Sequence, residues 1–216
     1  VSETGTSYYN VFVDGKLHKV VKVCGTDTLI HLVSGIDKRI HSLKIQKRSE
    51  GEFGKTTVHQ FVLSGSGRLA EEPAVRTRHI EFIGNSLTCG YGTDGKHRDE
   101  PFLVETENCN LTFASMVARY YDADYTLIAH SGRGAARNYG DSVRVSKVTM
   151  KDRMLNTFDE DLTHKWNFKE YRPDLVVINL GSNDFSTEPH PYKSEFTKAY
   201  KQILAQLREH YGDIPI

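Results

Sequence analysis

A serine and several glycines follow an apolar segment near the middle of the chain. The segment IEFIGNSLTCGYG spans residues 80–92, and Ser86 comes two residues after the glycine that ends the apolar stretch. Such a loop can bind a phosphate, end a strand as an ordinary turn, or present a serine nucleophile. These three functions require different surroundings, so the neighbouring sequence helps to separate them.

The glycine spacing matches two nucleotide-binding patterns. Gly90, Gly92 and Gly95 fit the dinucleotide pattern G-x-G-x-x-G, and residues 90–96 match most of a P-loop. Both mechanisms need the loop to join a strand directly to a helix, whose first amides hold the phosphate. Here the apolar run ends well before the glycines, and the HRDEP sequence after them is not typical of a helix start. We therefore disfavour both nucleotide interpretations.

What remains is a strand followed by Gly-Asn-Ser. The G-x-S-x-G elbow of α/β-hydrolases is also incomplete, because Thr88 stands where the second glycine belongs. A serine at a strand end is by itself ordinary turn chemistry. Two later segments favour catalysis instead, since HSGRGAARNYG (130–140) and GSNDF (181–185) each follow another predicted strand.

Serine, glycine and asparagine at successive strand ends suit acyl transfer. Open α/β sheets place their sites beyond the carboxyl ends of the strands. A serine acyl-transfer enzyme needs a hydroxyl nucleophile and hydrogen-bond donors for the developing oxyanion. A glycine amide and an asparagine side chain can supply such donors, so these segments form a candidate esterase site.

The elements that must position these residues alternate between strand and helix from residue 78. Apolar runs predict parallel strands at 79–84, 124–130 and 174–181. Helices are predicted at 111–123 and 193–212, the second ended by Gly212. In the first helix, the apolar residues at helical spacing are Phe113, Met116, Val117 and Tyr120. DIPI at 213–216 reads as the start of a further strand, so the predicted sheet is incomplete.

Residues 1 to about 64 have an all-β pattern. Asp14-Gly15 between two β-rich runs predicts a two-residue hairpin. Further short strands are predicted at 28–35, 40–49 and 56–65, a spacing that suits an antiparallel sandwich or jelly roll with some strands missing. The segment 64–76, which contains Pro73, has the composition of a linker. We therefore predict a partial β-sandwich domain at 1–70 and a partial α/β domain at 78–216.

Composition disfavours nucleic acid and membrane partners. The 28 Lys and Arg residues are balanced by 28 Asp and Glu residues, so the basic excess of a nucleic-acid-binding protein is missing. No apolar run reaches the roughly 18 residues of a transmembrane helix.

Cys24, Cys89 and Cys109 form no C-x-x-C pair, which disfavours a zinc site. We expect three separate thiols, with a Cys89–Cys109 disulfide as the alternative.

At the three strand ends the sequence resembles the SGNH, or GDSL-type, hydrolases. GNSLT is similar to their first block, with Asn85 where many members have Asp, SGRGAARNY to the second, and GSNDF to the third. The longer forms FIGNSLTCGYG and VVINLGSNDF resemble in particular the carbohydrate esterases of family 2. The resemblance covers about residues 8–216. It implies an α/β fold, a flavodoxin-like three-layer domain with a parallel sheet, preceded by an all-β jelly-roll or sandwich domain.

The resemblance also implies a role for each matching residue. Ser86 would be the nucleophile, and its own backbone N–H would join the oxyanion hole. Gly132 would give a second donor through its amide, and Asn183 a third through its side chain. Gly134 takes the place of Gly132 if the second block is shifted by two residues. Asp184 is expected to support the Ser86 loop, and Arg133 and Arg137 are candidates to line a substrate cleft.

The general base that the resemblance implies is a histidine near the C-terminus, after the last strand. His97 and His164 precede the third block, which is the wrong chain order, and His190 lies in a loop before the last helix. We therefore expect the base to follow Ile216.

The resemblance implies a secreted, periplasmic or cell-surface serine esterase without metal or cofactor. It would remove O-acetyl groups from polysaccharides such as xylan or mannan through an acetyl-enzyme, so its partner would be an acetylated polysaccharide or oligosaccharide. One alternative is an SGNH lipase or acyl-thioesterase, although residues 87–110 offer little apolar surface for a lipid groove. Another is a non-catalytic carbohydrate-binding protein on the same scaffold.

Overall fold

The C-terminal half of the protein is built on a parallel sheet. The computed structural model describes residues 1–37, 39–71, 74 and 76–216. The sheet contains β6 (His79–Gly84), β7 (Asp124–Ala129) and β8 (Leu175–Ile178), in the order β7-β6-β8. The first strand in the chain thus lies between the next two, as in flavodoxin-like folds. The three strands predicted from apolar runs are confirmed.

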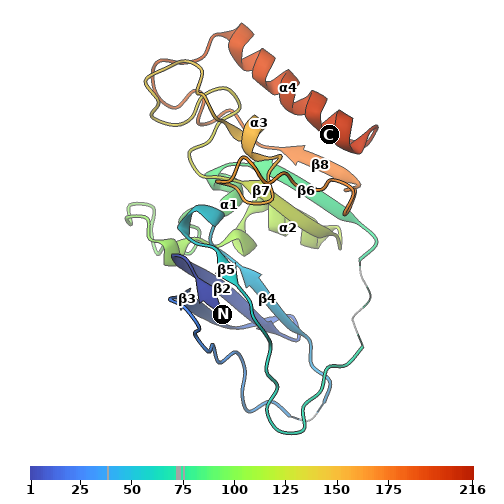
Figure 1. Ribbon diagram of the computed structural model, residues 1–216. Coiled ribbons are helices and arrows are strands. Elements are labelled where there is room, and N and C mark those ends of the chain that lie inside the picture. Colours follow the sequence, from blue (N-terminus) through green and yellow to red (C-terminus); the bar gives the residue numbers. More distant parts are fainter. Residues whose placement is uncertain (38, 72–73, 75) are drawn as a thin grey trace.

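Helices cover both faces of this sheet (Figure 1). The short α3 (Met150–Arg153) and the long α4 (Lys193–Tyr211) lie on one face, and α2 (Phe113–Tyr120) lies on the other. Successive side chains of β6 point to opposite faces of the sheet. Phe82 packs in the hydrophobic cluster that contains α2, and Ile83 packs in the cluster that contains α3 and α4. The expected three-layer α/β arrangement is confirmed.

Helix α2 buries a different face from the one its large apolar residues indicate. Phe113, Met116, Val117 and Tyr120 are each more than a third exposed, whereas the small residues Ala114, Ser115 and Ala118 are buried. Small side chains let the helix approach the sheet closely. The larger apolar residues of the helix consequently lie at the edge of its contact with the sheet or in solvent.

The N-terminal half contains two small antiparallel sheets. β2 (Thr6–Val13) pairs with β3 (Lys16–Cys24) and β4 (Leu43–Lys47), and β1 (Ser2–Glu3) pairs with β5 (Thr56–Thr57). The Asp14-Gly15 hairpin is confirmed, because both residues have positive φ, as its tight turn requires.

Three of the predicted strands are wrong or much shorter than expected. Residues 28–35 form no strand, and Leu29 is 88% exposed, because the backbone there has no neighbouring strand with which to pair. Of residues 56–65 only the first two are in a strand. Residues 213–216 form no named strand either, although Val176 of β8 donates its N–H to Pro215 O at 3.0 Å. In the proposed linker, the described residues are exposed and belong to no helix or strand, and Pro73 lies outside the described residues.

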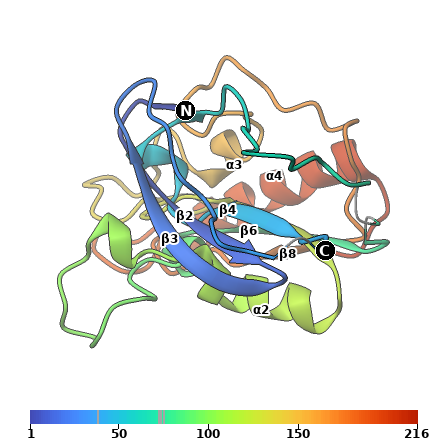
Figure 2. The same cartoon turned by 90° about the horizontal axis from the view of Figure 1, so that it is seen from below.

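The sheet of β2, β3 and β4 lies beneath the C-terminal half, on the side of α2, as the two views show (Figures 1 and 2). Polar contacts join the halves. Gln46 Nε2 donates to the Tyr125 hydroxyl at 2.8 Å, and Asn10 Nδ2 donates to Asn108 Oδ1 at 3.0 Å. Short 3-10 helices, η1 (Gly51–Phe53), η2 (Val104–Thr106) and η3 (Cys109–Leu111), lie in the connecting loops. All three cysteines are free thiols, as expected.

Candidate active site

The three polar strand ends meet at one edge of the parallel sheet. The register pairs Gly84 with Ala129 and Ile83 with Ile178, so the strands end together. Hydrogen bonds then join the loops that follow. Asn85 Nδ2 in the first loop donates to Ser182 Oγ in the third at 3.0 Å, and Asn183 Nδ2 in the third donates to Arg133 O in the second at 2.8 Å. The structure therefore brings the three predicted segments together.

Ser86 is the first residue of α1 (Ser86–Cys89), a single helical turn that directly follows β6. Asn85 is the N-cap of this turn, and its side chain accepts a hydrogen bond from Leu87 N at 3.3 Å. The Ser86 side chain is half-buried, and its backbone N–H has no acceptor among the described residues. A free amide beside a serine hydroxyl is what an oxyanion hole requires.

Steric constraints, rather than phosphate binding, account for two glycines around Ser86. A Cβ on Gly84 would lie 2.0 Å from Thr88 Oγ1, and a Cβ on Gly90 would lie 2.4 Å from Asn108 O. Gly90 also ends α1 in the left-handed conformation, with φ of 88°. These glycines allow the chain to turn sharply from strand into helix and away again.

Gly132, and not Gly134, presents a free amide in the second loop. Gly132 has φ of 75° and is half-buried, and its N–H has no acceptor among the described residues. Gly134 is buried, and its N–H points to Asn138 Oδ1 at 3.4 Å. A Cβ on Gly134 would also lie 2.0 Å from Arg137 O, so this glycine is needed for close packing. The geometry favours Gly132 as the donor.

Asn183 reaches the second loop with its side-chain amide. The residue is only 8% exposed, and the hydrogen bond from Nδ2 to Arg133 O fixes its orientation. A side-chain amide carries two hydrogens, so this bond leaves the second one for another acceptor. Its placement agrees with the predicted role without testing it.

Asp184 organises the second loop, and the expectation that it supports the Ser86 loop is wrong. Its carboxylate is fully buried and accepts hydrogen bonds from the backbone N–H groups of three successive residues, at 2.7–3.0 Å. These residues are Ala135, Ala136 and Arg137. Three successive amides that point to one place form an anion-binding concavity, which a carboxylate fills.

Arg137 does not line a cleft, contrary to expectation. Its side chain is fully buried and donates to Val143 O and to Thr187 Oγ1, both at 3.0 Å. It ties the second loop to the third. Arg133 is half-buried, and its carbonyl is the acceptor for Asn183.

Family comparisons agree with this arrangement of strand ends. Residues 82–216 match the model of the GDSL-like Lipase/Acylhydrolase family, and residues 1–73 match that of the carbohydrate esterase 2 N-terminal region. The chain belongs to the GDSL-like lipase/acylhydrolase family. The resemblance seen in the three sequence blocks is thereby confirmed.

Two curated relatives carry esterase names. The chain is 35% identical, over its whole length, to the cellulase/esterase CelE of Acetivibrio thermocellus, of which it covers 26%. It is 33% identical, over 83% of its length, to an acetylxylan esterase / glucomannan deacetylase of Cellvibrio japonicus, of which it covers 49%. The chain therefore spans half or less of the length of these relatives.

Two solved structures with a similar fold are carbohydrate esterases of family 2. One from Clostridium thermocellum, in complex with cellohexaose, superposes with a TM-score of 0.92 at 35% identity, over 99% of this chain and 64% of that one. Another, from Corynascus thermopiles, gives a TM-score of 0.88 at 26% identity, over 99% of this chain and 65% of that one.

In the described part of the chain, no histidine forms a hydrogen bond with the Ser86 hydroxyl. His97, His164 and His190 are all exposed, and His190 Nδ1 lies 3.3 Å from its neighbour Glu188. None of these three histidines, which the sequence offered as candidates, therefore lies in a position to act as the base for Ser86. The position of the base remains a prediction.

Sequence reasoning missed a buried histidine next to the second loop. His130 directly follows β7 and is 1% exposed. Its Nε2 lies 3.2 Å from Glu52 Oε2 in the N-terminal half, and its Nδ1 pairs with Asp159. Both ring nitrogens thus face carboxylates, which fixes the ring within the fold. Nothing in the local sequence indicates these partners, because both come from distant segments.

A second missed group consists of Glu50, Cys89 and Glu107, all buried. One carboxylate oxygen from each glutamate and the Cys89 sulfur lie within 4.8 Å of one another. Burial and the neighbouring Glu50 charge raise the pKa of Glu107 to about 9. Burial likewise raises the pKa of the Cys89 thiol. Glu107 is therefore neutral near pH 7, while the thiol keeps its proton.

The same residue types can ligate metals. Glu50, Glu52 and His130 also approach within 4.8 Å, as do His130, Asp159 and Glu160. Their contacts, however, are already those of ion pairs, because His130 is paired on both nitrogens and Arg153 Nη1 lies 3.1 Å from Asp159. These contacts explain the cluster as internal charge pairing.

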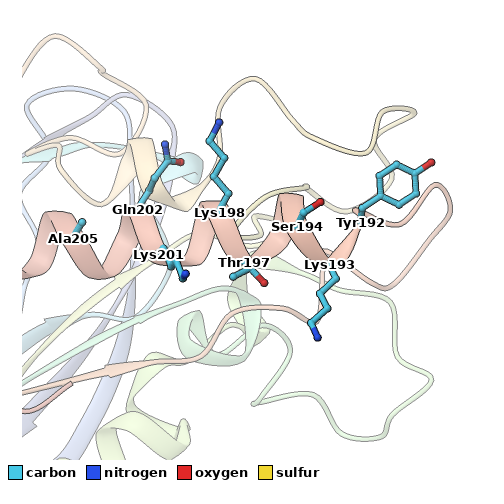
Figure 3. Close-up of a pocket in the computed structure, with 8 residues that line it drawn as sticks. All are labelled: Tyr192, Lys193, Ser194, Thr197, Lys198, Lys201, Gln202 and Ala205. Carbon is cyan, nitrogen blue, oxygen red and sulfur yellow. The ribbon is translucent and has the colours of Figure 1, made fainter.

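A surface hollow lies away from the strand ends. It has a volume of about 900 Å³ and runs along the outer face of α4 (Figure 3). Its lining comes from the start and middle of that helix: Tyr192, Lys193, Ser194, Thr197, Lys198, Lys201, Gln202 and Ala205. It includes none of the site residues, so the candidate site is defined by the strand-end loops and not by this groove.

Proposed function

We propose that this protein is a serine esterase that removes O-acetyl groups from polysaccharides such as xylan or mannan. The observation that carries the proposal is the meeting of Ser86, two backbone amides and the Asn183 side chain at one sheet edge; the two amides have no acceptor within the described part of the chain. The names of the relatives, acetylxylan esterase and glucomannan deacetylase, support the substrate class. So does the cellohexaose bound by a similar structure.

In the proposed reaction, Ser86 Oγ attacks the acetyl carbonyl carbon and loses its proton to a base. The carbonyl oxygen becomes an oxyanion, which the Ser86 and Gly132 amides and Asn183 Nδ2 stabilise by hydrogen bonding. When the intermediate collapses, the C–O bond to the sugar breaks, and the sugar oxygen leaves with the proton that the base returns. Water then repeats the attack on the acetyl-enzyme and releases acetate.

We propose that the base is a histidine other than His97, His130, His164 and His190. A serine hydroxyl is a poor nucleophile near neutral pH without an adjacent base. Support comes from the exposed positions of His97, His164 and His190 and from the pairing of His130 with carboxylates.

We also propose that the protein acts outside the cytoplasm, either secreted or at the cell surface or periplasm, because a polysaccharide substrate is too large to enter the cell. The N-terminal domain is proposed to be a jelly roll, supported by its antiparallel strands and its match to the carbohydrate esterase 2 N-terminal model. Among the described residues, none of the helices has the length and apolarity that a bilayer-spanning segment needs.

The test is hydrolysis by the complete enzyme of 4-nitrophenyl acetate, acetylated xylan and 4-nitrophenyl octanoate. We expect turnover of both acetyl substrates, much slower cleavage of the octanoate, and a loss of on the order of 10³-fold or more for Ser86→Ala. Ser142→Ala, an exposed serine in the second loop region, serves as the matched control.

Preference for the octanoate would support a lipase or acyl-thioesterase instead. Binding of xylan without any Ser86-dependent acetate release would indicate a non-catalytic carbohydrate-binding protein.

A further inference from the structure

One carboxylate of the N-terminal half contacts both loops that carry the free amides. Glu50 Oε2 accepts a hydrogen bond from Ser131 N at 2.7 Å, and Cys89 Sγ donates to the same oxygen at 3.4 Å. Ser131 immediately precedes Gly132, and Cys89 ends the helical turn that Ser86 begins. A single buried oxygen atom therefore links the two segments whose relative position sets the oxyanion hole.

Glu50 is itself held in place by Glu107. Its backbone N–H donates to Glu107 Oε2 at 2.9 Å. Glu50 is 7% exposed and Glu107 is fully buried, and the Oε1 atom of each has no partner among the described residues. Burial and the neighbouring Glu50 charge raise the pKa of Glu107 to about 9, so Glu107 carries a proton near pH 7.

Other titratable or charged groups near the pair come from five segments. Lys47 and Glu52 lie on the N-terminal side, Tyr91 follows α1, Cys109 begins η3, and His130 follows β7. Arg48 Nε donates to the backbone oxygen of Glu107 at 2.7 Å, which fixes the segment that carries this residue. Glu50 thus lies in a preorganised position with few alternative conformations.

We propose that Glu50 is a positioning residue for the oxyanion hole. Through Ser131 and Cys89 it fixes the Gly132 loop relative to the Ser86 helix, and Glu107 holds its backbone by accepting the Glu50 N–H. The inference rests on the proposed esterase function. Oxyanion donors act only within a narrow range of about 2.7–3.1 Å, so a small movement of either loop reduces the stabilisation of the transition state.

The test compares three variants of the complete enzyme on 4-nitrophenyl acetate, with rates normalised to active sites by the initial burst of 4-nitrophenol. Glu50→Met keeps the side-chain length but removes the acceptor, and we expect kcat to fall by about 10- to 100-fold with KM within about twofold. Glu50→Gln retains an acceptor oxygen for Ser131 N and should restore most of kcat. Glu105→Gln, an exposed glutamate in η2, is the matched control.

An unchanged kcat in Glu50→Met, or an equal loss in Glu50→Gln, would overturn the proposal. If Glu50→Met does not fold, Glu50→Asp decides, because its carboxylate is one methylene shorter. A fall in kcat at constant KM supports positioning, and an unchanged kcat refutes it.

Two further measurements distinguish a positioning carboxylate from a metal ligand and from a failure of the esterase mechanism. Loss of wild-type activity in EDTA that Zn²⁺ restores would overturn the inference, since the cluster would then be a metal site. Activity that survives Ser86→Ala would overturn the esterase mechanism itself. Activity abolished by Ser86→Ala but unaffected by Glu50→Met would refute only the role of Glu50.

Discussion

Ser86 owes its position to the residues on either side of it. Gly84 permits a close approach of Thr88, and Asn85 caps the single turn that Ser86 begins. The cap also donates to Ser182 in the third loop, so a residue that looks like local turn chemistry links two strand ends. For single residues, the groups that donate hydrogen bonds around Ser86 therefore matter as much as the serine nucleophile.

Asn183→Ala should lower kcat for acetyl esters by about 10²–10³, as expected when one oxyanion donor is removed. KM should change little, because the amide contacts the charge that develops in the transition state. The measurement is steady-state hydrolysis of 4-nitrophenyl acetate by the complete enzyme.

The bond from Asn183 to Arg133 O offers a way to recognise a purely structural role. If Asn183→Ala lowers the thermal midpoint but leaves kcat unchanged, the residue only connects the second and third loops. Ser186→Ala, which changes a neighbouring side chain on the same loop, is a suitable control.

At the scale of elements, the second loop is shaped by a group outside its own sequence. Asp184, which follows β8, accepts hydrogen bonds from three consecutive backbone amides of the loop that follows β7. Gly134 must lack a side chain for this carboxylate to fit, since a Cβ there would lie 2.4 Å from Asp184 Oδ2. The free amide of Gly132 depends on this rigid support.

Asp184→Asn should destabilise the fold by about 1.5–3 kcal/mol, the usual range for hydrogen bonds to a charged group. An amide offers only one acceptor oxygen, so at least one backbone N–H would be left unpaired in a buried site. Urea unfolding monitored by circular dichroism gives the free energy. Asp174→Asn, an exposed aspartate that accepts one backbone bond from His79, should cost clearly less. Equal effects for the two variants would argue against the support role of Asp184.

At the scale of the whole molecule, buried charge joins the N-terminal and C-terminal halves. Arg48, which directly follows β4, is 2% exposed and donates to the backbone oxygens of Glu105 and Glu107, at 3.0 and 2.7 Å. It also pairs with Asp94 near the Ser86 helix. These contacts hold both halves in a fixed arrangement, which Glu50 requires in order to act on the loops.

Arg48→Met should cost about 1.5–3 kcal/mol, the usual range for the loss of hydrogen bonds that involve a charged group. The loss leaves the backbone oxygens of Glu105 and Glu107 without this donor, whereas Asp94 keeps the hydrogen bond from Asn108 Nδ2. Urea unfolding of the variant tests this, with Arg39→Met as the exposed control. A loss below about 1 kcal/mol would mean that water replaces the guanidinium.

Glu107 makes the stability of the protein depend on pH. Its pKa is raised to about 9 in the folded state, against an ordinary value of 4.5. The folded protein therefore binds an extra proton between these values, and its stability falls as pH rises from about 4.5 to about 9. Below about pH 4.5, Glu107 is protonated in both the folded and the unfolded state, and its full contribution to stability is retained.

Glu107→Gln cannot titrate, so its unfolding free energy should decline less over the same window and exceed that of the wild type at pH 8. Its amide oxygen can still accept from Glu50 N, as the Glu107 carboxyl does. Urea titrations at pH 5, 6, 7 and 8 make the comparison, and Glu105→Gln should follow the wild type. Parallel curves for Glu107→Gln and wild type would contradict this account.

The sequence by itself determined the parts that depend on local patterns. Apolar runs placed β6, β7 and β8, and Asp14-Gly15 placed the hairpin. The three polar blocks after the strands indicated a site, and their resemblance to the GDSL-type hydrolases identified Ser86, Gly132 and Asn183 as its candidates. These features could be predicted because strand periodicity, turn conformation and motif spacing are properties of neighbouring residues.

Only the tertiary structure decided the features that join distant segments. The buried face of α2, the absence of a strand at 28–35, the choice of Gly132 over Gly134 and the position of Asp184 all depend on which elements pack together. The contact of Glu50 with Ser131 spans 81 residues of sequence. Long-range pairing follows from the packing of the whole chain, so no local pattern in a single sequence can specify it.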